Sequence, residues 1–261
     1  MLFWHFWWLF LPLSTGFTQA IKYKKNQLIQ HTLDTNHAYA HKLALAAENF
    51  IQSAHTQLGY AADVVAQNFN DEALLLAEVE RLYEQTASFN SVTVVDAQGI
   101  ILATAPSTLE VVGAQLTEGG GPEALRVQTP WVSRPFLSVA GNLIVLISAP
   151  VFAETGEYLG YVGGAIYLEE PSILHSLLDR HFHIDGSYIY VVDNHKQIIF
   201  HPEPERIGAY ILDNQAINSV VENESGSKEV VNSKGIDMLA GYAPVAATQW
   251  GWWRSAPLRQ R

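Results

Sequence analysis

The sequence contains no cysteine among its 261 residues, which excludes disulfide bonds, thiolate metal sites and cysteine nucleophiles and leaves the redox compartment undetermined. Basic residues are also scarce, with 15 Lys and Arg against 26 Asp and Glu and a net charge of −11. No basic block interrupts the body of the chain, which argues against nucleic acid as a partner. Because 48% of the residues are hydrophobic, the chain can bury a core, and disorder is excluded.

Catalytic motifs are missing as well. The serines have no nucleophile-elbow context, and the glycine run 119–121 is followed by Pro122 in place of the lysine pair of a phosphate loop. Residues 181–185, HFHID, alternate as metal ligands can, but no second cluster supports them. His201 has no nucleophile partner. The sequence therefore predicts a protein that is not an enzyme and that holds no metal or other cofactor.

The first 17 residues, MLFWHFWWLFLPLSTGF, are almost wholly apolar, and lysines follow at positions 22, 24 and 25. The run is short for a membrane span, which needs about 20 residues, and it lacks the basic start of a signal peptide. We expect residues 1–20 to be a membrane anchor or a signal segment, and cleavage after Ala20 remains the alternative to an anchor.

A long helix is expected over residues 21–70, as one helix or two stacked ones. No proline or glycine falls between Thr18 and Leu58. Small or apolar residues recur at steps of three and four, as one face of a helix requires: Leu43, Ala47, Phe50, Ala54, Leu58, Ala61 and Val65. The polar first half is typical of a stalk. A second helix is expected over residues 71–85, capped by Asn70 or Asp71.

An internal repeat organises the rest of the chain. Val94-Val95-Asp96, a turn and Ile100-Ile101 recur as Val191-Val192-Asp193, a turn and Ile198-Ile199. Three further matches follow in the same order, the last of them Gly160-Tyr161-Val162 with Gly251-Trp252-Trp253. The repeat predicts an α+β fold with two tandem antiparallel sheet units, joined by a helix within residues 171–180 and fed by the long helix.

Residues 128–168 are expected to form a three-stranded antiparallel meander. Gly and Asn break the apolar runs at Ala140-Gly141-Asn142 and at Glu154-Thr155-Gly156, where turns are expected. We take this block as the binding half of a sensor.

The first strand of this meander carries candidate ligand-binding residues. Trp131, Ser133 and Arg134 combine a ring, a hydroxyl and a fixed cation, which suits a small polar molecule. In a regular strand Arg134 and Phe136 share the face opposite Trp131, whereas a bulge at Pro135 would bring Trp131 and Arg134 to one pocket.

Tyr161, in the last strand of the meander, is a further candidate. For each of these aromatic residues the alternative to ligand binding is packing in the core. No acid lies between Arg126 and Glu154 to pair with Arg134, so we expect a ligand with an anionic group such as a carboxylate. The matching segment of the second copy, 226–238, is short and polar. That copy is expected to transmit a signal and not to bind.

The order VVDAQGIILAT, SRPFLSVAGNLIVLISAPVF and YVVDNHKQIIFHPEPERIG after a long helix resembles the double Cache sensor domains of bacterial transmembrane receptors. The resemblance covers residues 25–255. It implies two PAS-like units, a membrane-distal one over residues 71–170 that binds a small molecule and a membrane-proximal one over residues 171–255, with residues 256–261 as a tail. It also implies an inner-membrane location with a periplasmic sensor region.

Two features depart from that family. Its receptors for free amino acids carry an Asp in the last strand of the distal unit, where Ala165 stands here, which argues against an amino acid ligand. The sequence also stops at WGWWRSAPLRQR without an output domain. A truncated receptor, a degraded product and a sensor acting through a partner remain open.

The function expected is therefore small-molecule sensing for an output domain that the family implies. The strands most resemble sensors of diguanylate cyclases, and histidine kinases and chemoreceptors are the other outputs. A tethered or secreted periplasmic binding or scaffold protein without signalling is the alternative. The long helix is also a candidate surface for a homodimer.

Overall fold

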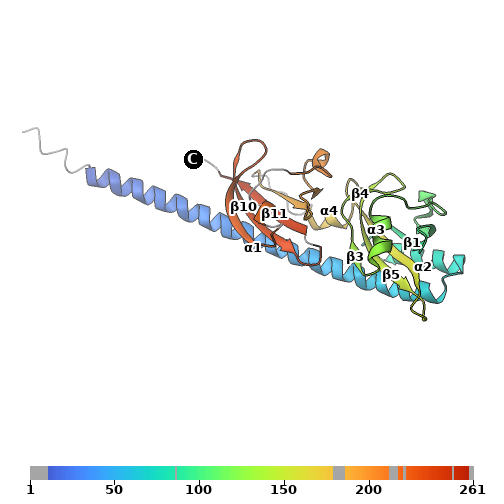
Figure 1. Cartoon of the computed structure of the whole chain (residues 1–261). Helices are drawn as coiled ribbons and strands as arrows, with labels where there is room; N and C mark the ends of the chain where they lie inside the picture. The colour runs from blue at the N-terminus through green and yellow to red at the C-terminus, as the bar shows by residue number, and fades with distance from the viewer. Residues whose placement is uncertain are drawn as a thin grey trace, which may run out of the picture.

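The computed structural model describes residues 11–85, 87–178, 186–211, 217–219, 222–248 and 250–258. One long helix runs along the same side of two β-sheets, which follow each other along its length (Figure 1). Residues 181–185, considered above as metal ligands, lie outside the described residues, as do residues 1–10. Within the described ranges, no group of three His, Asp or Glu residues is arranged to hold a metal ion.

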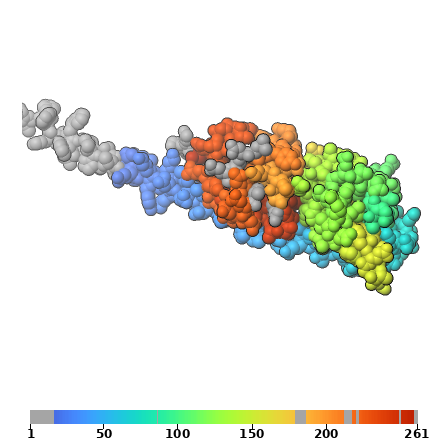
Figure 2. Space-filling view, in the orientation of Figure 1, coloured from blue at the N-terminus to red at the C-terminus, as the bar shows by residue number. Residues whose placement is uncertain are grey.

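The long helix, α1, comprises 57 residues, Leu11–Gln67, which confirms the expected helix and shows it to be one helix and not two stacked ones. It begins inside the segment expected to be an anchor or signal. Its buried stripe faces the sheets and contains the predicted positions, apart from the half-buried Phe50: Leu33, Ala40, Leu43, Ala44, Ala47, Ile51, Ala54, Leu58, Ala61, Ala62 and Val65. Residues 17–28 are exposed and extend beyond both units (Figure 2).

Across the described part of the chain, no helix has an apolar stretch of the length that a membrane span requires.

The second helix, α2 (Glu72–Gln85), begins where its cap was expected. Asp71 Oδ1 accepts hydrogen bonds from the backbone N–H groups of Ala73 and Leu74, at 3.1 and 3.2 Å. This arrangement satisfies two of the donors that a helix start leaves free.

The first sheet has the strand order β2-β1-β6-β5-β3, with β4 paired to β5, and all its pairs are antiparallel. Its elements in chain order are β1 (Ser91–Asp96), β2 (Ile101–Ala105), η1 (Ser107–Leu109), α3 (Gly120–Val127), β3 (Trp131–Val132), β4 (Phe136–Leu137), β5 (Leu143–Phe152) and β6 (Tyr158–Tyr167). We call residues 71–170 the first unit.

The second sheet has the order β8-β7-β11-β10-β9, again antiparallel throughout. Helix α4 (Ile173–Leu178) precedes it, within the segment expected to link the units. The remaining elements are β7 (Tyr188–Val192), β8 (Ile198–Phe200), η3 (Pro204–Arg206), β9 (Gly226–Val231), β10 (Asp237–Val245) and β11 (Trp250–Pro257). We call residues 171–255 the second unit.

The two sheets have equivalent strand orders, which confirms the internal repeat. The repeated Asp turns also agree. Asp96 Oδ1 accepts hydrogen bonds from the backbone N–H groups two and four residues later, at 2.9 and 2.8 Å. Asp193 Oδ1 does the same at 2.8 Å for both bonds. The sequence repeat is therefore a repeat of one folded unit.

The last match of the repeat needs a correction of one residue. Tyr161 of β6 lies opposite Val95 of β1, and Gly251 of β11 lies opposite Val192, the counterpart of Val95. Gly251 thus corresponds to Tyr161 and not to Gly160. Because successive side chains of a strand point to opposite faces, this shift changes which residues are equivalent on each face.

The first strand of the predicted meander is not regular: it is divided into β3 and β4 next to Pro135, where a bulge was considered above. Both short strands pair with β5, and Arg134 and Pro135 lie between them. Proline has no N–H for a ladder bond. Ser133 holds the break closed, since its N–H donates to the Leu146 carbonyl and its Oγ accepts the Leu146 N–H, both at 2.8 Å.

The main core lies between α1 and the two sheets. It includes Val92 and Val94 of β1, Val191 of β7 and the buried stripe of α1 in one continuous cluster. The opposite face of the first sheet packs against a smaller cluster around Val95 and Leu146. That second face points away from α1.

Candidate functional site

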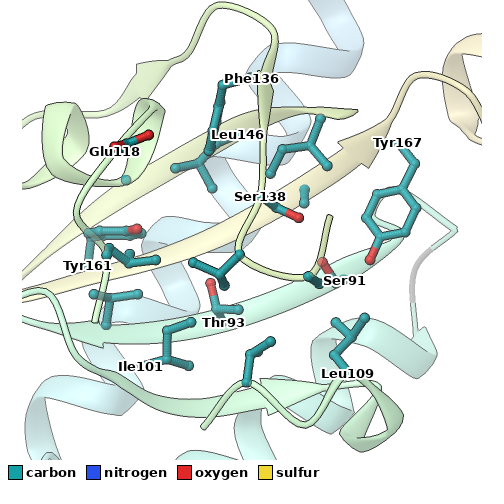
Figure 3. Close-up of a pocket in the computed structure, with 18 residues that line it drawn as sticks. Ser91, Thr93, Ile101, Leu109, Glu118, Phe136, Ser138, Leu146, Tyr161 and Tyr167 are labelled. Carbon is teal, nitrogen blue, oxygen red and sulfur yellow. The ribbon is translucent and has the colours of Figure 1, made fainter. Parts of the chain in front are cut away.

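A cavity opens on the face of the first sheet that points away from α1 (Figure 3). Its empty space is about 610 Å³, solvent at the mouth included. Strands form the floor, and the loops around η1, α3 and β4 form the walls. The lining residues are Ser91, Thr93, Val95, Ile101, Leu109, Val111, Leu116, Glu118, Gly121, Phe136, Ser138, Val139, Ala140, Ile144, Leu146, Tyr161, Ala165 and Tyr167.

Strand β1 supplies part of the floor by the alternation of its side chains. Ser91, Thr93 and Val95 line the cavity, whereas Val92 and Val94 pack in the core beside α1. Successive side chains of a strand point to opposite faces, so one strand serves both the core and the site. Small hydroxyl residues at two of the three cavity positions leave room above the sheet.

The polar groups of the cavity are mainly hydroxyls, from Ser91, Thr93, Ser138, Tyr161 and Tyr167. Figure 3 shows the Tyr167 hydroxyl directed towards Ser91. Burial raises the pKa of Tyr161, and nearby Tyr158 adds to this effect. The Tyr161 hydroxyl therefore stays protonated and can donate a hydrogen bond.

Glu118, exposed on the loop before α3, is the one carboxylate among the described residues that line the cavity. The same lining contains no Lys, Arg or His side chain. A ligand cation would meet a countercharge at this cavity, and a ligand anion would meet none within it.

Phe136 forms one wall and rests against the glycine run that precedes and begins α3. A Cβ atom added to Gly119 would lie 2.3 Å from the Phe136 ring, and one added to Gly120 would lie 2.5 Å from it. The glycines let the ring approach the backbone. The glycine run 119–121, which does not form a phosphate loop, therefore has a packing role beside the cavity.

The structure brings two of the five predicted site residues, Phe136 and Tyr161, to the cavity. Trp131 packs against the neighbouring apolar cluster. Ser133 is buried and donates its hydroxyl to the Arg134 carbonyl at 2.8 Å. Arg134 is exposed. These three lie outside the cavity lining, and a ligand-binding role for them stays a prediction.

Arg134 acts electrostatically on the second unit. Burial raises the pKa of Asp193 above its ordinary value, and backbone hydrogen bonds from Gln197 and His195 oppose this rise. Electrostatic interactions with His195 and with the guanidinium of Arg134 oppose it further. The charge of Arg134 in the first unit therefore favours the ionised form of the Asp193 carboxyl in the second unit.

The sequence did not point to Ser91, Thr93 or Glu118, and it offered core packing as the alternative for Tyr167 as for the other aromatic residues. A signal existed for Ser91 and Thr93, because SVTVV alternates polar and apolar residues along one strand. Glu118 has no such signal, since the position of a loop residue depends on the whole fold. Ala165 lies in the floor of the cavity, at the position where the sequence comparison noted a missing Asp.

Aromatic rings fill the equivalent place in the second unit. Thr93 lies opposite Gly163 in the first sheet, and Tyr190 lies opposite Trp253 in the second. The Tyr190 and Trp253 rings stack with centroids 5.3 Å apart and planes at 11°. Two large rings thus replace a threonine and a glycine, so among the described residues this position is filled in the second sheet and borders the cavity in the first.

Comparisons with known proteins agree with this architecture. A sequence profile of the Cache domain family, dCache_1, matches residues 22–260. No curated protein matches the chain.

Solved structures share the fold at low sequence identity. The extracellular ligand-binding receptor from Desulfohalobium retbaense aligns with a TM-score of 0.69 and 18% identity, over 83% of this chain and 39% of that one. The ligand-binding domain of the Pseudomonas aeruginosa chemoreceptor PctB, in complex with L-Gln, aligns with a TM-score of 0.64 and 16% identity, over 85% and 90%. The periplasmic sensory domain of the Campylobacter jejuni chemoreceptor Tlp1 aligns with a TM-score of 0.67 and 12% identity, over 87% and 95%.

Proposed function

Because the chain belongs to the Cache domain family, we propose that it senses a small molecule through the cavity of its first unit. The observation that carries this proposal is the hollow at the centre of the first sheet, where apolar walls surround a few hydroxyls. Mostly apolar clefts with a few placed polar groups are the usual form of small-molecule sites. The second sheet, filled by Tyr190 and Trp253 at the same place, is the internal comparison.

The lining supports a partly apolar ligand with hydrogen-bonding groups. Solved relatives include domains in complex with L-Gln, with asparagine and with GABA, and these ligands carry an ammonium group. In this chain Ala165 supplies no carboxylate to the cavity floor, and Glu118 supplies one at the rim. We infer that a charged ligand would place a cationic group towards Glu118, in contrast to the anion expected from Arg134.

The wider role follows from the family. The chain would serve as the periplasmic sensor region of an inner-membrane receptor, whose diguanylate cyclase, kinase or chemotaxis output lies in another segment or protein. Exposed apolar side chains of α1, such as Leu28, Leu45 and Tyr60, support pairing of two chains along this helix. A tethered binding protein without output is the second candidate, and its site would be the same.

A thermal-shift screen of amino acids, amines and neutral metabolites on the full chain tests the proposal. A ligand at about a hundredfold excess over its Kd adds about 2.7 kcal/mol to the stability of the folded state. Ala165→Leu places a larger side chain in the cavity floor and should abolish the shift. Ala38→Leu, on an exposed position of α1, is the matched control and should keep it. A ligand that stabilises Ala165→Leu as well as the parent chain binds elsewhere, and the proposal then fails.

A further inference from the structure

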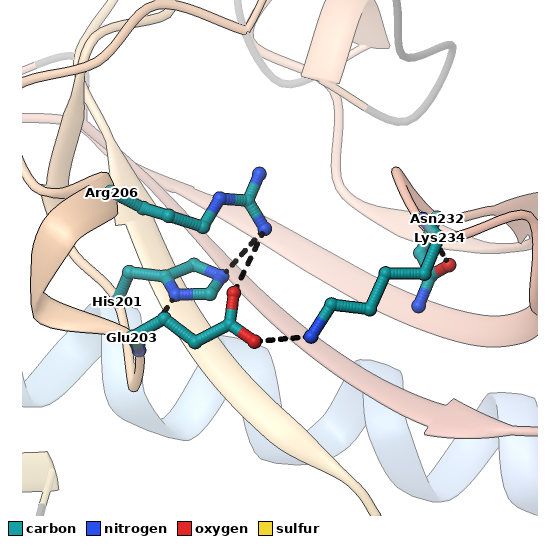
Figure 4. A network of polar contacts seen from close by, with 5 residues as sticks. All are labelled: His201, Glu203, Arg206, Asn232 and Lys234. Atoms are coloured by element: carbon teal, nitrogen blue, oxygen red, sulfur yellow. Dashed lines mark hydrogen bonds and ion pairs between the residues drawn. The ribbon is translucent and has the colours of Figure 1, made fainter.

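A second group of polar side chains gathers in the second unit. His201, Glu203 and Arg206 come from the segment that runs from the end of β8 through η3, and Asn232 and Lys234 come from the turn between β9 and β10 (Figure 4). All five line a cavity of about 710 Å³, solvent at the mouth included. We call this group the His201–Arg206 site.

The backbone decides which nitrogen of His201 carries the proton. The Glu203 N–H donates a hydrogen bond to His201 Nδ1 at 2.9 Å. Nδ1 must therefore offer a lone pair, and in a neutral imidazole the other nitrogen then carries the hydrogen. His201 is consequently the Nε2–H tautomer, with only 5% of its surface exposed.

This tautomer leaves two donors facing each other. Arg206 Nη1 lies 3.0 Å from His201 Nε2, the distance of a hydrogen bond (Figure 4). A guanidinium nitrogen has no lone pair and can only donate. With Nε2 protonated, neither group accepts from the other. A buried donor without an acceptor is costly, and one acceptor placed beside both nitrogens would satisfy the two N–H groups together.

The nearby carboxylate does not fill this role. Glu203 is hydrogen-bonded to Lys234, and this bond lowers the pKa of Glu203 and keeps it charged. Its other oxygen, Oε2, lies 4.0 Å from Arg206 Nη1, beyond hydrogen-bond distance. Asn232 Oδ1 is also engaged, by the backbone N–H groups of Lys234 and Ile236, each at 3.0 Å.

Protonation of the ring does not remove the conflict. Burial, and after it the charge of Arg206, lowers the pKa of His201 to about 4, against the weaker opposing effects of Glu203 and Glu205. The ring is therefore neutral near pH 7. Even a protonated ring would only add donors, which increases the need for an acceptor.

We propose that the His201–Arg206 site is a second ligand site, which binds a small organic carboxylate between His201 Nε2–H and the Arg206 guanidinium. A carboxylate has two oxygens that match the fork of an arginine. The ring centroids of Tyr188 and Tyr190 lie 5.7 and 6.0 Å from that of His201, and both tyrosines border the space beside it. These rings offer an apolar wall for the carbon part of the ligand.

This site is separate from the one proposed for sensing. It lies in the other unit and has cationic lining residues, whereas the lining of the first cavity has none. It also differs from the expectation drawn from the sequence, that the second unit transmits a signal and does not bind.

Isothermal titration calorimetry on the full chain tests the proposal, with acetate, succinate and citrate as probes. Inorganic phosphate and uncharged succinamide are the comparison ligands. At least one carboxylate should bind, and Arg206→Ala should weaken it by about tenfold or more, as the loss of a charged hydrogen bond implies. Lys234→Ala, on an exposed turn, should also weaken binding and is the second variant if Arg206→Ala does not fold. Arg126→Ala, in the first unit, is the matched control and should bind normally.

Three results would overturn the proposal: no carboxylate binds at millimolar concentration, affinity is unchanged in folded Arg206→Ala and Lys234→Ala, or succinamide or phosphate binds as well as the carboxylates. Ala165→Leu separates this test from that of the sensing cavity. It should keep carboxylate binding and lose the ligand of the first unit, whereas Arg206→Ala should do the reverse. Either site can thus fail without the other.

Discussion

The buried ring of His201 makes the stability of the folded chain depend on pH. Its pKa is lowered from 6.5 to about 4, first by burial and then by Arg206. Between these values the unfolded chain binds a proton that the folded chain does not, so stability is full above about pH 6.5 and falls as the pH drops towards 4. We predict that this ring contributes a loss on the order of 1–2 kcal/mol between about pH 7 and about pH 5.

Urea unfolding at the two pH values measures this loss, in buffers free of carboxylates. His201→Gln removes the titrating ring but not the other acidic and basic groups, so its loss should be smaller. Equal losses in the parent chain and in His201→Gln would show that the ring is not the source.

Arg134 is the residue on which the sequence and the structure lead to different expectations. If Arg134 were buried and paired with a ligand anion, its substitution by Ala would weaken ligand binding by roughly 2–5 kcal/mol. Substitutions of exposed side chains usually change stability by about 0.5 kcal/mol or less, and an exposed side chain outside the cavity should have a similarly small effect on binding. Because Arg134 is exposed and outside the cavity lining, we predict that Arg134→Ala leaves the affinity of the first-unit ligand within about twofold.

The same variant should raise the pKa of Asp193, whose charge Arg134 helps to stabilise. Titration calorimetry with the ligand from the screen, together with the pH dependence of unfolding, measures both effects. A large loss of affinity with an unchanged fold would restore Arg134 to the ligand site.

At the scale of elements, the contact between α1 and β10 depends on one glycine. A Cβ atom at Gly241 would lie 2.1 Å from the carbonyl carbon of Asn36 and 2.2 Å from the nitrogen of His37, both backbone atoms of α1. Asn36 also donates its side-chain amide to the Leu239 carbonyl at 2.8 Å, in a buried hydrogen bond. The strand and the helix are therefore held backbone to backbone.

We predict that Gly241→Ala lowers the free energy of unfolding by about 1–3 kcal/mol or more, the usual range for overpacking, since backbone atoms cannot move aside. Gly59→Ala is the matched control, because nothing lies within 4 Å of its added Cβ in α1. That change should stabilise the chain by roughly 0.5–1 kcal/mol through helix propensity. Urea unfolding measures both, and a neutral Gly241→Ala would contradict the close contact.

At the scale of the whole molecule, one core joins the two units. The main cluster contains residues of α1, of both sheets and of the linking helix α4, including Leu174 with 1% of its surface exposed. Leu143 of the first unit also lies near Gly208 of the second. A shared core favours unfolding as a single cooperative unit.

We predict one unfolding transition and a loss of about 2–5 kcal/mol in Leu174→Ala, the range for truncating a buried Leu. Hydrogen exchange followed by mass spectrometry measures the two sheets separately. Protection of β5 and of β10 should fall together in Leu174→Ala. A fall confined to one sheet would mean that the units unfold independently.

The sequence by itself determined the features that depend on local pattern. The steps of three and four predicted α1, and the absence of Gly and Pro allowed it to run unbroken. The repeated Val-Val-Asp motif predicted two similar sheets, because each Asp closes its own turn with backbone groups only two and four residues away. Asp71 capped α2 for the same local reason. Family and fold followed from this order of elements.

The tertiary structure alone decided where the cavities proposed as ligand sites lie. The first cavity exists because α1 covers one face of the sheet and because Gly163 and Thr93 stand where Trp253 and Tyr190 stand in the second sheet. The sequence match of β6 with β11 is displaced by one residue, so the sequence alone does not reveal that Trp253 is the counterpart of Gly163. The site around His201 joins Arg206 to Lys234 of a distant turn. Cavities and charge clusters arise from residues far apart in the chain, and local periodicity carries no information on which of them meet.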